Sequence, residues 1–233
     1  MSTIADNIAN VRERIHRAAV SAQKDPDSVT LLAISKTHPA SAVRDAWTCG
    51  IRDIGENYLQ EALDKMATLD DLPLTWHFVG PIQSNKTKAI AEHFDWVHSV
   101  DRLKIARRLS EQRPAHLPPL NICLQVNISR EESKSGVSVE DLPELAEAVA
   151  QLPGLRLRGL MAIPAPAEDP ESRRAPLRAL REAMQALPLT LDTLSMGMSD
   201  DLIEAVQEGA TMVRIGTALF GAREYASTPQ DQG

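Results

Sequence analysis

The chain has 233 residues, 43% of them hydrophobic, which suffices for one substantial buried core. Its net charge of −7 comes without a concentrated basic stripe, so we expect no nucleic-acid partner. No run approaches the roughly 18 to 20 apolar residues of a membrane span, and residues 1–22 lack the apolar segment of a secretion signal. We therefore expect no membrane association and a cytoplasmic location.

The N-terminal residues predict a helix that flanks the rest of the fold. Ile4, Ile8, Val11 and Ile15 recur at a helical spacing and form one apolar stripe, while charged residues occupy the other faces. The segment DPDS at 25–28 ends this helix, because it combines proline with residues that favour turns.

From residue 29 onward the sequence repeats a unit of strand, loop and helix. The expected strands are residues 29–36, 51–54, 75–79, 95–100, 120–126, 155–163, 190–194 and 211–215. The expected helices are residues 40–49, 58–69, 86–93, 101–109, 142–152, 175–187 and 200–208, and Asp101 is expected to cap the fourth. A last short helix is expected to open at Gly216 and Thr217.

Eight such units predict a (β/α)8 TIM barrel over about residues 29–224, within a single domain of residues 1–233. Residues 225–233 are polar and are expected to form a disordered tail. An open doubly wound sheet is the structural alternative, but no GxGxxG motif follows the first strand.

The two cysteines and six histidines indicate neither a disulfide framework nor a metal centre. Cys49 and Cys123 lie far apart beside apolar positions, which is typical of buried, reduced thiols. No histidine pairs with a cysteine or a carboxylate at the spacing of metal ligands, so we expect no metal site.

Functional groups of a TIM barrel come from the C-terminal ends of its strands. The residues that the sequence places there are Lys36, Asn57, His77, Ser99, Asn127, Met161, Ser195, Ser199 and Arg214. Strand alternation puts Lys36 on the same side as Ile34, and Arg214 on the same side as Met212, so both cations are expected to point into the barrel mouth. Lys36 is either a solvated lysine or an amine that forms a Schiff base with a carbonyl.

The loops after the last two strands carry the features of a phosphate site. Gly197 permits an unusual turn, Ser199 is placed to cap the next helix, and Gly216 and Thr217 open another helix. Each feature alone is also typical of an ordinary helix start, but amides and hydroxyls together bind phosphate, and barrels commonly do so here. A lysine, an arginine and a phosphate cradle predict either a pyridoxal 5′-phosphate (PLP) protein or a Schiff-base aldolase acting on a sugar phosphate.

Seven segments between residues 29 and 221 carry a resemblance: AISKTHP, DIGENYLQEA, WHFVGPIQSNK, the VNIS-to-SKSG loop, LRGLMAI, LSMGMSDDL and VRIGTALFG. Together they resemble the pyridoxal phosphate homeostasis protein family, of the YggS or PROSC type. The resemblance implies the barrel of the alanine-racemase type without the racemase's extra β-domain, and PLP as the cofactor. It also implies that Lys36 forms the internal aldimine with PLP and that Arg214 faces the pyridine nitrogen. The other implied residues hold the phosphate (Ser199, Gly216 and Thr217) or line the pocket (Asn57 and Met161).

Three functions remain: a PLP homeostasis protein that supplies the cofactor to apo-enzymes, an amino-acid racemase, and the aldolase. Related racemases take their second base, a tyrosine, from a second domain across a dimer, whereas the tyrosines here are Tyr58 and Tyr225. An arginine keeps its proton, so it leaves the pyridine nitrogen neutral and makes PLP a poor electron sink. We therefore expect a monomeric binding protein rather than an enzyme.

Three lysines in loops remain without an assigned role. Lys86 and Lys88 follow the GPIQSN segment, and Lys134 lies in the SREESKSG segment. They are either solvated lysines or phosphate contacts during the loading and transfer of PLP.

Overall fold

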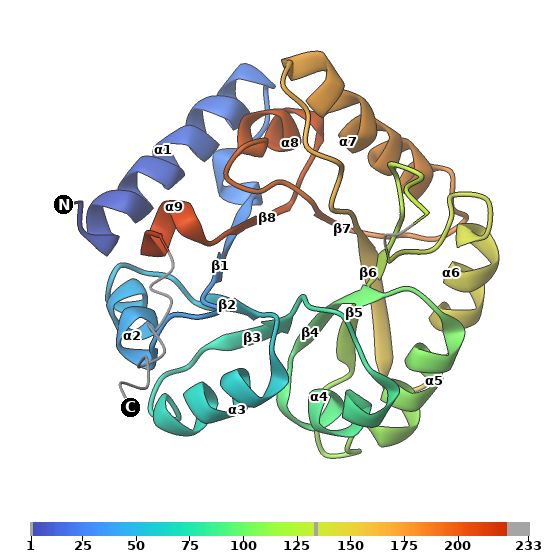
Figure 1. The fold of residues 1–233 in the computed structure, drawn as a ribbon. Helices are drawn as coiled ribbons and strands as arrows, with labels where there is room; N and C mark the ends of the chain where they lie inside the picture. Colours follow the sequence, from blue (N-terminus) through green and yellow to red (C-terminus); the bar gives the residue numbers. More distant parts are fainter. Residues whose placement is uncertain (1, 133–134, 223–233) are drawn as a thin grey trace, which may run out of the picture.

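The computed structural model describes residues 2–132 and 135–222, in which eight parallel strands close into a barrel ringed by helices (Figure 1). The strands are β1 (Thr30–Ile34), β2 (Asp53–Glu56), β3 (Thr75–Phe78), β4 (Trp96–Val100), β5 (Leu120–Gln125), β6 (Leu155–Met161), β7 (Thr193–Ser195) and β8 (Met212–Ile215). Their order around the barrel follows the chain, and β8 closes against β1 with Leu32 beside Arg214. The predicted (β/α)8 TIM barrel is confirmed.

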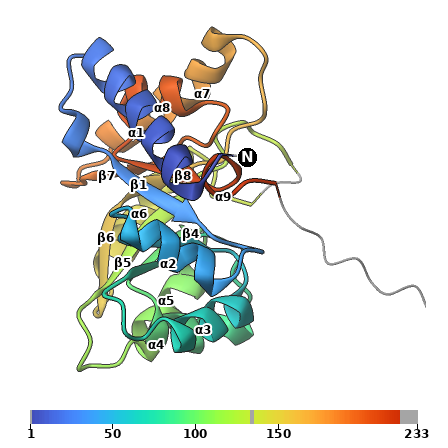
Figure 2. The same cartoon turned by 90° about the vertical axis from the view of Figure 1, so that its left-hand side faces the viewer.

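Helices alternate with the strands around the outside of the barrel. They are α1 (Ile4–Ser21), α2 (Ala40–Thr48), α3 (Leu59–Thr68), α4 (Thr87–His93), α5 (Leu103–Gln112), α6 (Leu142–Ala150), α7 (Pro170–Gln185), α8 (Leu202–Glu208) and α9 (Thr217–Phe220), with 3-10 turns η1 (Pro26–Ser28) and η2 (Ser84–Lys86). The expected N-terminal helix is confirmed as α1, which a capping box between Thr3 and Asp6 starts. Figure 2 shows α1 along the outside of the barrel, where it packs against α2, α8 and α9.

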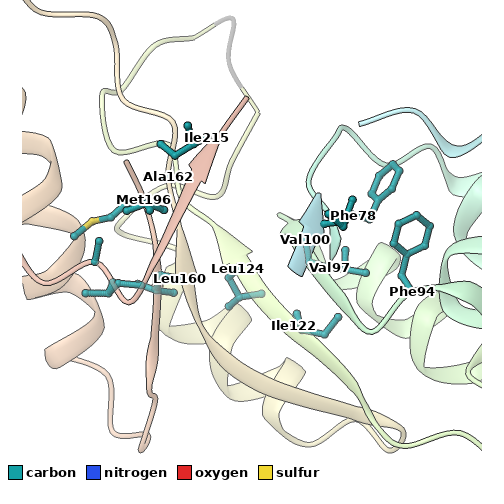
Figure 3. Close-up of a cluster of buried hydrophobic side chains, with 14 of the residues drawn as sticks. Phe78, Phe94, Val97, Val100, Ile122, Leu124, Leu160, Ala162, Met196 and Ile215 are labelled. Carbon is teal, nitrogen blue, oxygen red and sulfur yellow. The ribbon is translucent and has the colours of Figure 1, made fainter. Parts of the chain in front are cut away.

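Strand alternation divides the buried side chains into two groups. One group points outward from the strands and packs against the helices; it includes Phe78, Val97, Ile122, Leu124 and Leu160 (Figure 3). The other fills the barrel interior, where Leu32, Ile34, Val79 and Met212 form a small apolar cluster. The interior is therefore packed, and the space for a ligand lies at its mouth.

Three helix starts differ by two or more residues from those predicted; one is that of α8, which begins at Leu202 rather than at residue 200. Helix α5 begins at Leu103 rather than at residue 101, and the Asp101 carboxylate accepts a hydrogen bond from the Gly136 amide instead of capping it. Helix α7 begins at Pro170, five residues before the predicted start, because Asp169 accepts from the Ser172 amide and proline suits a first helical turn.

Within the described ranges, no helix is long and apolar enough to cross a membrane. Among the same residues, no group of three or more histidine, cysteine, aspartate or glutamate side chains is arranged to hold a metal ion. Both cysteines are free thiols. The predicted tail, with Tyr225, and the loop lysine Lys134 lie outside the described residues.

Candidate functional site

A cavity of about 640 Å³ opens at the C-terminal ends of the strands, a volume typical of small-molecule sites. The residues that line it come from β1, β8, α9 and the loops after β1, β2, β3, β6, β7 and β8: Ile34, Lys36, Asn57, Val79, Ile163, Met198, Ser199, Asp200, Arg214, Gly216, Thr217 and Ala218. Six of the seven predicted site residues are therefore brought together. The seventh, Met161, is fully buried at the end of β6 and does not line the cavity.

Lys36 lies on a tight turn just beyond the end of β1. The Ser35 carbonyl accepts hydrogen bonds from the His38 amide at 3.0 Å and from the Lys65 ammonium at 2.6 Å. Thr37 has a φ of 67°, a strained conformation for a β-branched residue, and its amide donates to the Glu61 carboxylate. The backbone on both sides of Lys36 is thus anchored to side chains of α3.

The anchor is a buried ionic cluster of Lys65, Glu56 and Glu61, which we call the α3 clamp. The Lys65 side chain is only 6% exposed, and its Nζ lies 2.7 Å from a Glu56 oxygen and 2.8 Å from a Glu61 oxygen. The Ser35 hydroxyl also donates to Glu56. Desolvation raises the pKa of the fully buried Glu56, and the positive charge of Lys65 offsets part of the rise.

Arg214 enters the cavity from the interior of the barrel, where its side chain is almost entirely buried. Its Nη1 donates to the Ser195 hydroxyl at 2.8 Å, and its Nη2 donates to the Ala162 carbonyl at 2.9 Å. Burial lowers the pKa of Arg214 to about 10, and the nearby Asp201 carboxylate opposes this shift. The guanidinium therefore stays protonated at neutral pH.

The loop after β7 is held in place from two sides. Gly197 has a φ of +99°, and an added Cβ would lie 2.5 Å from the Ala205 side chain, so this turn requires glycine. The Asp201 carboxylate accepts from the Met198 amide, and Arg14 of α1 donates to the Ser199 carbonyl. Ser199 does not cap α8 as predicted, since α8 begins at Leu202.

The loop after β8 brings α9 close to β1. Gly216 precedes α9, and a Cβ at this position would lie 3.3 Å from the Ile34 carbonyl oxygen. Thr217 is the first residue of the helix, as predicted. The first amides of a helix have no acceptor within it, so Gly216 and Thr217 add donors to the cavity wall.

The other predicted strand-end residues do not line this cavity. His77 and Ser195 are fully buried inside the barrel, and the Ser99 hydroxyl donates to the Gly80 carbonyl. Asn127 lines a neighbouring cavity of about 320 Å³ that shares Asn57 with the first one. Among the described residues, the buried side-chain oxygen of Asn57 has no hydrogen-bond partner.

Several residues at the site were not predicted. Ile163 and Met198 are partly exposed apolar members of the cavity wall, and their places just beyond β6 and β7 were the available signal. Lys65 resembles any lysine of an amphipathic helix, and its spacing of four from Glu61 was the signal for that pair. Of the loop lysines, Lys88 is 73% exposed and lies 3.9 Å from Glu92, which favours the solvated interpretation.

Comparisons with known proteins agree with this geometry. The family described as "Alanine racemase, N-terminal domain" matches residues 1–224. The pyridoxal phosphate homeostasis protein of Pseudomonas aeruginosa is 69% identical over 227 residues, covering 97% of this chain and 99% of that protein. The Escherichia coli protein of the same name is 53% identical over 232 residues, with coverage of 97% and 99%.

Solved structures extend the comparison. PipY of Synechococcus elongatus, in a structure with PLP bound, is 42% identical with a TM-score of 0.78 and covers 91% of this chain and 100% of its own. Alanine racemase from Corynebacterium glutamicum is 17% identical with a TM-score of 0.68, covering 97% of this chain and 64% of the racemase, which shows a shared fold alone. The family expected from the seven sequence segments is confirmed. The chain belongs to the pyridoxal phosphate homeostasis protein family, built on the barrel of the alanine racemase N-terminal domain.

Proposed function

We propose that this protein binds PLP at the mouth of the barrel and supplies it to apo-enzymes, holding the cofactor without turning over a substrate. The observation that carries the proposal is one cavity that gathers an amine, a guanidinium and two hydroxyls: Lys36, Arg214, Ser199 and Thr217. The names of the relatives at 69% and 53% identity and the PLP bound in PipY support the choice of ligand.

The groups around the cavity fit the parts of PLP. Bound PLP supplies an aldehyde carbon, a phosphate and a pyridine ring that withdraws electrons. Lys36 would hold this group through its Nζ, an amine that can condense with an aldehyde: a C=N bond replaces the C=O bond, and the oxygen leaves as water with the two amine protons. The α3 clamp supports this role, because it fixes the backbone on both sides of Lys36.

The phosphate is held by the loops after β7 and β8. Ser199, Thr217 and the start of α9 line the cavity together and carry hydroxyl and amide donors. Such groups form charge-assisted hydrogen bonds with phosphate oxygens, which are stronger than bonds between neutral groups. Gly216 lets this cradle lie close to β1, and the side-chain oxygen of Asn57 is an acceptor for a donor on the ligand.

Arg214 is the residue that would meet the pyridine nitrogen, and it favours binding over catalysis. A pKa of about 10 keeps the guanidinium protonated, so it would donate a hydrogen bond to the nitrogen and leave it as an unprotonated acceptor. An unprotonated ring stabilises a carbanion poorly, which disfavours racemisation. Tyr58 is exposed and does not line the cavity, and no tyrosine is among the described residues that do.

We also propose that the protein acts as a monomer in the cytoplasm. Both cysteines are free thiols, as expected in a reducing compartment. Burial raises the pKa of the Cys123 thiol to about 12, so this thiol stays protonated and unreactive.

The proposed function is tested by two assays on one preparation. Protein loaded with PLP and separated from unbound cofactor should restore activity to an apo-PLP-enzyme of another fold. The same protein should not carry solvent deuterium into the Cα of alanine or invert its chirality. The Lys36→Ala variant should lose transfer, whereas Lys88→Ala, which removes an exposed lysine, should keep it.

Failure to reactivate the apo-enzyme would contradict the supply role. Racemisation that depends on Lys36 and reaches about 1 s⁻¹ or more, an ordinary enzymatic rate, would make the protein a racemase.

A further inference from the structure

A line of buried polar groups crosses the barrel interior below the cavity. It runs from Arg214 through Ser195, His98 and His77 to Asp53, and the three middle side chains are fully buried. The atom pairs are Arg214 Nη1 and Ser195 Oγ at 2.8 Å, Ser195 Oγ and His98 Nδ1 at 2.7 Å, His98 Nε2 and His77 Nδ1 at 2.9 Å, and His77 Nε2 and Asp53 Oδ1 at 2.8 Å. Asp53 is 27% exposed and lines a second cavity, of about 390 Å³, at the opposite end of the barrel.

The two ends of this line fix the direction of every hydrogen bond in it. Arg214 has donors only, so the Ser195 oxygen accepts and its hydroxyl proton is left to donate to Nδ1 of His98. At the other end of the line, Oδ1 of Asp53 accepts from Nε2 of His77. A neutral His98 that accepts at Nδ1 carries its proton on Nε2, so it donates to Nδ1 of His77.

The surroundings keep the His98 imidazole neutral and hold both rings in place. Burial lowers the pKa of His98 well below its ordinary value, and the neighbouring His77 and Arg214 act in the same direction. The Trp96 ring stacks on His77 with an interplanar angle of 17° and also contacts His98. Both histidines therefore carry their single proton on Nε2, and every donor along the line meets one acceptor.

We propose that Asp53, His77, His98 and Ser195 are positioning residues for Arg214, forming a one-way hydrogen-bond relay that ends on the Asp53 carboxylate. Among residues 2–132 and 135–222, Arg214 makes no ion pair within 4.0 Å. The nearby Asp201 carboxylate is one counter-charge for Arg214, and the relay adds a distant one through polarised hydrogen bonds, which are strengthened in a low-dielectric interior. Its hydrogen bond to Ser195 also fixes one edge of the guanidinium inside the barrel, so that the remaining N–H groups can donate to a ligand in the cavity.

The role toward the ligand rests on the proposed function, because it takes PLP as the group that Arg214 meets. If Arg214 donates to the pyridine nitrogen, the relay orients that donor from the far end of the barrel. The relay itself exists without a ligand, so its hydrogen-bond direction is measured on the ligand-free protein.

The first test reads the histidine tautomers of the ligand-free protein by long-range ¹H–¹⁵N NMR at pH 7.5. We expect His77 and His98 to be neutral with the proton on Nε2. A proton on Nδ1 of either ring would overturn the relay. If the tautomers are as expected but the protein fails to bind PLP, the proposed function is contradicted and the relay is still supported.

The second test compares Asp53 with Asp27, because both carboxylates line the second cavity, at the opposite end of the barrel. Asp53 contacts His77 and is the end of the relay. In protein loaded with ¹⁵N-labelled PLP, Asp53→Asn should shift the ¹⁵N resonance of the pyridine nitrogen. The same variant should bind PLP about threefold to tenfold more weakly, as expected for residues coupled in one network. The matched control Asp27→Asn should change neither. The positioning role would be overturned if Asp53→Asn kept the ¹⁵N shift, the PLP affinity and the histidine tautomers of the unmutated protein.

Discussion

Ser199 and Thr217 present two hydroxyls to the cavity from loops that follow different strands. Replacing either with alanine should weaken PLP binding by roughly 1.5 to 3 kcal/mol, the value of a hydrogen bond to a charged group. The bond to Lys36 should survive, since neither hydroxyl takes part in it. A spectroscopic titration with PLP measures the effect, and pyridoxal, which lacks the phosphate, is the control. Equal affinity of the unmutated protein for pyridoxal and PLP would contradict the phosphate cradle.

His98 makes the stability of the ligand-free protein depend on pH. Its pKa lies well below 6.5 in the folded state, so below pH 6.5 the unfolded chain binds a proton that the folded protein does not. Stability is therefore complete above pH 6.5 and falls as the pH drops, by up to about 1.4 kcal/mol per pH unit. Urea unfolding from pH 7.5 to 5.5 should show a steeper loss for the unmutated protein than for His98→Gln. Equal slopes for the two proteins would contradict the neutral, buried His98.

The position of each residue relative to the end of its strand explains which site residues the sequence could predict. Lys36, Asn57 and Ile163 lie one or two residues beyond the ends of their strands, and they reach the cavity. Met161 lies within its strand and stays below the cavity, although alternation gives it the same inward direction as Ile163. Arg214 also lies within its strand but is long enough to reach the cavity. Alternation predicts direction, whereas depth depends on where each strand ends.

At the level of elements, α3 positions the turn that carries Lys36. Lys65→Met should leave Glu56 buried without its cation, and we expect a loss of about 3 to 5 kcal/mol in the free energy of unfolding. Adding Glu56→Gln should recover part of the loss by removing the uncompensated charge. Urea denaturation measures both variants, with the exposed Lys104→Met as the control. A Lys65→Met protein as stable as the control would show that the α3 clamp contributes little.

The α3 clamp could not be predicted from the sequence, because it joins Glu56 of β2 to residues of α3 that become its neighbours through the fold. The start of α7 could have been predicted, since Asp169 and Pro170 are an ordinary N-cap and first-turn pair. The expected helix of residues 175–187 instead starts after this pair. The relay is also beyond sequence reasoning, because its residues come from β2, β3, β4, β7 and β8.

At the scale of the whole molecule, the repeat of strands and helices was enough to predict the closed barrel. Closure then places β1 beside β8, so Lys36 and Arg214 meet at one cavity although they are far apart in the sequence. This consequence follows from topology and needs no side-chain detail. The single domain over residues 1–233 stays a prediction, because residues 223–233 lie outside the described part of the chain.

The central claim, that Lys36 holds PLP covalently, is tested most directly by borohydride trapping. Borohydride reduces the Schiff base to a stable secondary amine, and peptide mapping by mass spectrometry then finds the modified lysine. We predict a mass increase on the peptide that contains Lys36, and its loss in Lys36→Ala. Trapping of PLP on another residue of the unmutated protein, or at the same stoichiometry in Lys36→Ala, would contradict the account.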